Sequence, residues 1–182
     1  MKRTRIAVAA LILTSLSSIA SAQVASAINP FSFGVSAGIA LPMGDFGTGF
    51  NMGFGGTGHV WFKLAPEFSL RGDVSYTTFG AKAPATGISV SGFGFGVNGV
   101  FDIPSAGPVS PYVTAGLGMY SNSASGCPGG CPSGETKFGF NGGGGINFDV
   151  GGQRIFVEAR YVSIQTTGTS TNFIPITVGI RF

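Results

Sequence analysis

Apolar and polar residues alternate one by one along most of the chain beyond residue 30, with the two-residue period of a β-strand. The alternation is clearest in the final segment, where Ile174, Ile176, Val178, Ile180 and Phe182 share one face. Seven earlier segments repeat it, and their apolar positions are Phe33, Val35, Ala37, Ile39 and Leu41; Val60, Phe62 and Leu64; Phe68, Leu70, Val74 and Tyr76; Phe93, Phe95, Val97 and Phe101; Val113, Ala115, Leu117 and Met119; Phe138, Phe140, Ile146, Phe148 and Val150; and Ile155, Val157, Ala159 and Tyr161. The pattern predicts eight β-strands.

The connections between these segments alternate in length. The longer connections are expected at 42–51, 80–87, 121–136 and 165–172, and the short ones near Pro66, at 103–108 and at 151–153. Short and long connections therefore lie at opposite ends of an up-and-down antiparallel sheet. Ile88 and Val90 fall out of phase with Phe93 and the residues after it, which predicts either a bulge near Gly92 or a later start of that strand.

Charged residues are scarce for a protein whose whole surface meets water. They make up 9% of the chain, against about 25% in a typical soluble domain. Beyond the N-terminal segment, Gly, Ser, Thr and Asn interrupt the apolar residues too often for a membrane-spanning helix. Strands in lipid must close into a barrel so that every backbone polar group is paired. The sequence therefore predicts an all-β fold, an eight-stranded antiparallel up-and-down transmembrane β-barrel.

A soluble lipocalin-like barrel with an apolar interior would show the same alternation. It would need a charged outer face to stay in solution. Here the polar face consists of Gly, Ser, Thr and Asn with a few charges, while the other face is uncharged throughout. The composition favours apolar side chains that face lipid, with short turns and both termini at the periplasmic end and the longer loops outside the cell.

The first 22 residues have the three-part form of a secretory signal peptide. Three basic residues precede the apolar run 6–13, and small residues lead to a cleavage site after Ala22, with a second candidate site after Ala27. We therefore expect a signal peptide at 1–22, a short N-terminal segment at 23–30 and the barrel at 31–182.

The positive charge of the chain belongs to this leader. Three of the ten Lys and Arg residues precede residue 23, so the mature chain has seven basic and seven acidic residues and no net charge. Affinity for nucleic acid depends largely on neutralising phosphates. We therefore expect no nucleic-acid partner.

The short turns predict which polar residues of neighbouring strands face one another. Pairing around Pro66 places His59 opposite Asp73, Trp61 opposite Arg71 and Thr57 opposite Ser75. Pairing around 151–153 places Asp149 opposite Arg154, Gly145 opposite Glu158 and Gly143 opposite Arg160. The interior of an eight-stranded barrel is just wide enough for side chains, and an unpaired buried charge is costly. We predict that His59, Arg71, Asp73, Glu158 and Arg160 form a polar network that fills the lumen and leaves no water-filled pore.

Two patterns resemble catalytic or cofactor sites. His59, Asp73 and Ser75 share one face, as the groups of a hydrolase would, but that face is the filled lumen and His59 is already paired. The run 53–58 matches G-x-G-x-x-G, yet a strand follows it where a dinucleotide site needs a helix. We expect no catalytic site, no cofactor and no metal site.

Two further groups of residues are expected at the ends of the strands. Cys127 and Cys131 are the only cysteines, and in an exported chain they predict a disulfide that stiffens the longest loop. The aromatic residues expected near the lipid boundary are Phe46, Phe50, Trp61, Tyr76, Tyr120 and Phe173, although Trp61 lies on the polar face and can stack on Arg71 instead.

The eight-strand pattern and the ending Ile174-Pro175-Ile176-Thr177-Val178-Gly179-Ile180-Arg181-Phe182 resemble the small outer-membrane β-barrel family that includes the OmpA-like and OmpX-like transmembrane domains. The resemblance covers residues 31–182. It implies a place in the outer membrane of a Gram-negative cell envelope, contact with its lipids, and reading of the last strand, with its terminal Phe182, by the outer-membrane assembly machinery. The chain stops at Phe182, so we expect no peptidoglycan-binding domain of the kind that follows the barrel in OmpA itself.

The function expected is that of a monomeric structural protein anchored in the outer membrane, without catalytic activity. The first alternative is a surface binding or adhesion module that meets an extracellular partner through the loops at 42–51 and 121–136. The second is a narrow channel.

Overall fold

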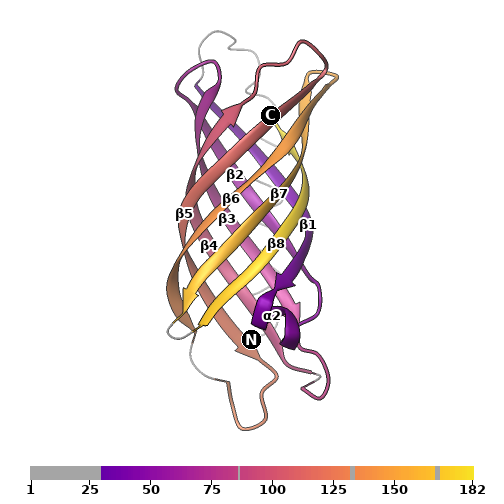
Figure 1. Ribbon diagram of the computed structural model, residues 1–182, viewed down its shortest axis with the longest axis vertical. Coiled ribbons are helices and arrows are strands. Elements are labelled where there is room, and N and C mark those ends of the chain that lie inside the picture. The colour runs from indigo at the N-terminus through magenta and orange to yellow at the C-terminus, as the bar shows by residue number, and fades with distance from the viewer. Residues whose placement is uncertain (1–29, 86, 132–133, 167–168) are drawn as a thin grey trace, which may run out of the picture.

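The computed structural model describes residues 30–85, 87–131, 134–166 and 169–182, and the expected signal peptide lies outside them. These residues form one closed antiparallel barrel in which every strand pairs with its neighbours in sequence and β1 pairs with β8 (Figure 1). The elements are β1 (Phe31–Met43), α2 (Gly44–Gly49), β2 (Gly53–Lys63), β3 (Phe68–Gly80), β4 (Ser89–Asp102), β5 (Val109–Ser125), β6 (Glu135–Val150), β7 (Gln153–Thr166) and β8 (Thr169–Arg181). The predicted eight-stranded up-and-down barrel is confirmed.

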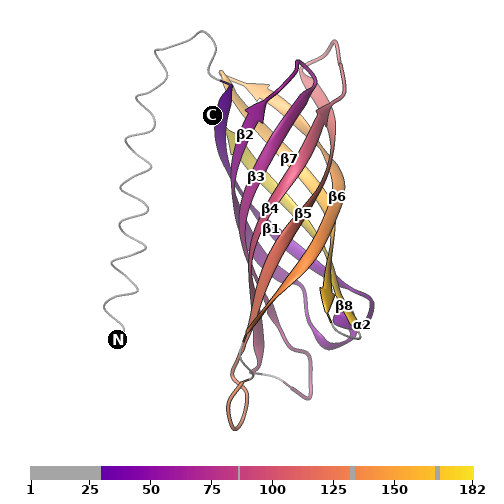
Figure 2. The same cartoon turned by 90° about the vertical axis from the view of Figure 1, so that its left-hand side faces the viewer.

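The two ends of the barrel differ, as the alternating connections predicted. The C-terminus lies at one end with the turns that follow β2, β4 and β6, and α2 lies at the other end with the longer connections (Figure 1). The β5–β6 hairpin extends furthest from the barrel (Figure 2). No helix in the described part of the chain has the length and hydropathy needed to cross a membrane.

The strands at the α2 end continue further than the hydrophobic pattern predicted. Residues 121–125 belong to β5 and residues 135–136 to β6, and most of the expected connection at 165–172 is strand. Ser121 pairs with Thr136, and the hydroxyl groups of Ser89 and Ser125 lie 2.8 Å apart. Hydroxyl residues on both faces hide the two-residue period once the strands rise above the apolar band, so the prediction of long loops was wrong there.

The prediction of a bulge near Gly92 was also wrong. β4 begins at Ser89, and it pairs with β3 one residue to one residue through Gly92. Val90 falls out of phase with the outward residues because it lies on the lumen side, where it lines an internal cavity.

The outward face of the barrel is apolar and the inward face carries the polar groups. Phe95, Leu117 and Val178 on three different strands are each 57% exposed, whereas Arg71 is completely buried and Glu158 is 2% exposed. This is the reverse of a soluble barrel, and it presents an uncharged belt of the kind that faces lipid.

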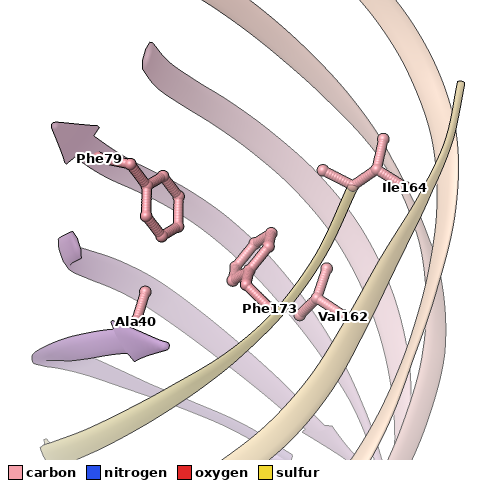
Figure 3. Close-up of a cluster of buried hydrophobic side chains, with 5 residues drawn as sticks. All are labelled: Ala40, Phe79, Val162, Ile164 and Phe173. Carbon is pink, nitrogen blue, oxygen red and sulfur yellow. The ribbon is translucent and has the colours of Figure 1, made fainter. Parts of the chain in front are cut away.

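The lumen also contains apolar residues that the sequence did not predict there. The buried cluster at the α2 end consists of Ala40, Phe79, Val162, Ile164 and Phe173 (Figure 3), and Phe46, Phe50 and Tyr120 pack against it. The placement of Phe46, Phe50, Tyr120 and Phe173 in a lipid-boundary girdle was therefore wrong, because their positions along the chain put them on the inner face. Tyr76, which is 54% exposed, does point outward.

Candidate functional site: the lumen

Four buried charges form a closed ring across the middle of the lumen. Arg71 Nη1 donates to Glu158 Oε2 at 2.6 Å, and Arg160 Nη1 donates to Asp73 Oδ2 at 2.7 Å. Arg71 Nε also lies 3.0 Å from Asp73 Oδ1, as an ion-pair contact without hydrogen-bond alignment, and Arg160 Nε lies 2.9 Å from Glu158 Oε1. Each cation thus touches both anions, and the four formal charges sum to zero. We call Arg71, Asp73, Glu158 and Arg160 the charge ring.

The charge ring joins opposite walls of the barrel. Arg71 and Asp73 lie on β3, and Glu158 and Arg160 lie on β7. In a closed ring of eight strands, β3 and β7 are four strands apart in either direction. Side chains at positions i and i+2 of a strand point to the same face. β3 and β7 therefore each contribute one acid and one arginine to the lumen, at the same level.

Three further side chains complete the hydrogen bonding of the two acids. Tyr112 donates its hydroxyl hydrogen to Glu158 Oε2 at 2.8 Å, and Asn98 Nδ2 donates to Asp73 Oδ2 at 2.9 Å. His59 Nδ1 lies 2.8 Å from Asp73 Oδ1. These partners satisfy the remaining lone pairs of carboxylates that have been removed from water, which is the condition under which buried charges are tolerated.

An aromatic layer covers the charge ring on the side of the short turns. Trp61, Tyr112 and Phe156 form a buried cluster with Val100. The guanidinium of Arg71 lies 5.7 Å from the centre of the Trp61 ring, as predicted from the pairing, and that of Arg181 lies closer, at 4.8 Å. Cations at these distances over an indole ring are attracted by its π electrons.

Glycines on the inner face leave room for these large side chains. A methyl group added at Gly34 would come within 2.8 Å of the Trp61 ring, and one added at Gly145 would come within 2.6 Å of the Tyr112 hydroxyl. The predicted pairing of Gly145 with Glu158 and of Gly143 with Arg160 is observed. The glycines of β6 therefore leave the space that the large side chains of the lumen occupy.

The chain matches the family model described as Outer membrane protein beta-barrel domain over residues 9–182. The chain belongs to this family. It is accordingly a protein of the bacterial outer membrane.

Solved structures of other outer-membrane barrels share the fold. The neisserial surface protein A superposes with a TM-score of 0.68 at 21% identity, covering 86% of this chain and 98% of that protein. The N-terminal barrel domain of Pseudomonas aeruginosa OprF gives 0.54 at 16% identity, covering 83% and 97%. Ail, the attachment invasion locus protein of Yersinia pestis, gives 0.50 at 19% identity, covering 85% and 100%. No curated protein sequence matches the chain.

The hydrogen-bond chain that most resembles a catalytic triad in this outer-membrane barrel involves Ser36 and not Ser75. Ser36 Oγ lies 2.9 Å from His59 Nε2, and His59 Nδ1 lies 2.8 Å from Asp73. The His59 ring packs against Trp61 and Phe156, with ring centres 5.1 and 5.5 Å apart. Ser36 and His59 are 8% and 3% exposed, so both side chains are buried in the lumen.

The remaining predicted sites lie at the two ends of the barrel. Cys127 and Cys131 form a disulfide in the β5–β6 connection. Phe182 extends the β1–β8 ladder by one pair, since its N–H donates to the carbonyl of Phe33 at 2.8 Å and its carbonyl accepts from the N–H of Phe33 at 2.9 Å. Across the described ranges, no three side chains of His, Cys, Asp or Glu lie together as metal ligands.

Several members of the lumen site could not be identified from the sequence. Tyr112 on β5 contacts Glu158 on β7, which is not a neighbouring strand. Asn98 and Ser36 reach Asp73 and His59 across the strand pairs β3–β4 and β1–β2, which have no short turn to set their register. Their small or polar neighbours on β1, β4 and β5 offered no distinguishing pattern.

Proposed function

We propose that this outer-membrane barrel is a structural anchor of the cell envelope, without catalytic activity. The observation that carries the proposal is the charge ring, whose paired side chains join β3 and β7 across the lumen. With the interior occupied, the outer belt and the loops are the parts of the molecule left to make contacts. The outward belt meets the membrane lipids, and the proposal places the protein there as a monomer.

The layered lumen argues against transport. A solute arriving from the α2 end would meet the apolar cluster, then the charge ring, then the aromatic layer below it. Opening this path requires separating paired charges that have little water around them. Each buried ion left without its partner costs several kcal/mol.

The terminal residue supports a role in assembly. The two hydrogen bonds between Phe182 and Phe33 join the last strand to the first, so the segment that closes the barrel is also the segment expected to meet the assembly machinery. Mutants of this residue would therefore show their defect while the barrel is forming.

Surface adhesion is the second candidate, because the β5–β6 hairpin projects beyond the barrel and is cross-linked at its tip. One of the solved relatives is an attachment invasion locus protein, and it has been solved with a heparin analogue. A polyanion needs basic groups, yet at this end of the present chain Lys82 donates to the carbonyl of Gly47 and Lys137 pairs with Glu135. These contacts leave little unpaired positive charge at this end for a polyanionic partner.

A complementation experiment separates the two candidates. A strain lacking the protein receives either the wild-type chain or a chain in which residues 123–134 are replaced by Asn-Gly, a two-residue turn that joins the paired residues Asn122 and Glu135. The structural role predicts that both chains restore resistance of the outer membrane to detergent. Loss of surface attachment with the shortened hairpin, together with no detergent phenotype in the deletion strain, would replace the structural proposal with adhesion.

A further inference from the structure

A band of hydroxyl side chains follows the apolar belt on the outer face of the barrel, at the α2 end. On four neighbouring strands, the outward residues change from apolar or aromatic to Thr78 of β3, Ser91 of β4, Ser121 of β5 and Thr136 of β6. Ser123 continues the band on β5, since residues two apart share a face of a strand. We call these five residues the hydroxyl collar.

The level of the hydroxyl collar matches the edge of a membrane. One row of the register joins Tyr76 of β3 and Phe93 of β4 to Ser121 of β5 and Thr136 of β6. The change from aromatic to hydroxyl side chains therefore falls one row earlier on β5 and β6 than on β3 and β4. Because the strands tilt against the barrel axis, the same row reaches further toward the α2 end on β5 and β6, whose hairpin extends furthest there (Figure 2). The boundary is thus nearly level around this side of the barrel, as the surface of a membrane is.

The outer face of the strands carries no charge. In the described parts of the eight strands, every acidic and basic residue lies at a position whose alternation points to the lumen. At the α2 end, the Lys82 ammonium donates to the carbonyl of Gly47, and that of Lys137 lies 2.7 Å from Glu135. Attraction of anionic lipid headgroups depends on clustered Lys and Arg, which the hydroxyl collar lacks.

Three hydroxyl groups of the collar are free to bind a partner. Ser91 donates to Thr78 at 3.2 Å, whereas Ser121, Ser123 and Thr136 form no side-chain hydrogen bond with other described residues. Ser123 and Thr136 are exposed, and Ser121 is half-buried. Each of these hydroxyls can donate one hydrogen bond and accept two. The hydroxyl groups of a sugar donate and accept in the same way, so they are complementary to this uncharged surface.

We propose that the hydroxyl collar binds the sugar headgroup of an uncharged glycolipid. The acyl chains of such a lipid would lie along the apolar belt directly beside the collar, where Phe93, Met119 and Phe138 are 55%, 57% and 51% exposed. This position distinguishes a lipid headgroup from a free sugar, because only the lipid contacts the belt and the collar together. The proposal rests on the anchoring role in the outer membrane, and it names the class of lipid that the barrel selects there.

The experiment is electron spin resonance of the full barrel in phosphatidylcholine membranes that contain a trace of a chain-labelled lipid. The spectrum separates lipids in contact with the protein from lipids in the bulk, and it gives a relative association constant for each headgroup. We expect a galactosyl diacylglycerol to associate about two- to threefold more strongly than phosphatidylcholine or phosphatidylglycerol with the same chains, the factor for one weak hydrogen bond.

Variants of the collar make the test specific. S121A/S123A/T136V removes the three free hydroxyls and should abolish the preference for the galactosyl lipid, while the barrel stays folded. Thr136→Lys adds a cation and should shift the preference to phosphatidylglycerol. Ser105→Ala is the matched control, because it removes an exposed hydroxyl from the turn after β4 at the opposite end.

Two results would overturn the proposal. One is equal association of the galactosyl lipid and phosphatidylcholine with the wild-type barrel, which would mean that the collar binds only water. The other is a preference for the galactosyl lipid that S121A/S123A/T136V retains. Either result leaves the anchoring role standing, since that role is tested separately by the detergent resistance of the deletion strain.

Discussion

Replacement of Glu158 by Gln tests whether the charge ring stabilises the barrel. The substitution preserves the size of the side chain but removes one negative charge, which leaves Arg71 and Arg160 with Asp73 as their only anion. Glu158 contacts Arg71 at 2.6 Å, Arg160 at 2.9 Å and Tyr112 at 2.8 Å, so each of these donors loses its charged acceptor. The variant therefore contains one uncompensated positive charge in a buried layer.

The expected loss of stability is large. Removing one partner of a buried ion pair costs about 3–5 kcal/mol. For a chain of this length, about 2–4 °C of unfolding temperature corresponds to 1 kcal/mol, so we expect Glu158→Gln to unfold roughly 6–20 °C below the wild type. Adding Arg71→Met restores electrical neutrality, and the double variant should recover part of the loss, as coupled residues do in a double-mutant cycle.

The assay is thermal unfolding in detergent micelles, monitored by circular dichroism and by the heat-dependent change of gel mobility. Glu135→Gln provides a matched control, because Glu135 makes the same kind of pair with Lys137 at the surface and its side chain is 70% exposed. The control should unfold with the wild type, since surface pairs contribute little. Equal unfolding temperatures for Glu158→Gln and the wild type would refute the stabilising role of the charge ring.

Three other predictions concern a glycine of the barrel wall, the disulfide of the β5–β6 connection and the terminal residue Phe182. Gly145→Ala should lower the unfolding temperature because the added methyl group meets the phenol ring of β5, whereas Gly72→Ala, with nothing within 4 Å on the outer face, should not; comparison of the two melting curves tests this. C127S/C131S should speed proteolysis of the β5–β6 connection on intact cells and lower the unfolding temperature by roughly 4–8 °C, because so short a closure contributes about 2 kcal/mol; unchanged cleavage would contradict it. Deletion of Phe182 should reduce the fraction of heat-modifiable barrel recovered from outer membranes, and full recovery would exclude a role for the terminal residue in assembly.

The sequence was most informative where a short turn joins two strands. The pairs His59–Asp73 and Gly145–Glu158 could be predicted because a tight hairpin determines the register of both arms and the alternation determines the face. Contacts across the lumen could not, since they depend on how far each strand is shifted relative to one four places away. The link between Arg71 and Glu158 therefore needed the structure, although its two residues were both expected inside.

The apolar half of the lumen shows a second limit. Alternation identifies two faces but does not require that the inner one be polar throughout, and Phe79, Phe156 and Phe173 fill the interior as well as polar residues do. In a membrane barrel only the outer face must be apolar, because lipid is the solvent there. Aromatic residues near strand ends are consequently ambiguous until the phase of each strand is followed to its last residue.

The conductance of the purified barrel in a planar lipid bilayer tests the central claim most directly, namely that the charge ring closes the lumen. We predict no unitary currents from the wild-type protein across the full range of applied voltage that the bilayer withstands. Stable currents from the wild type, abolished by blocking the α2 end, would show that the lumen conducts and that the protein is a channel.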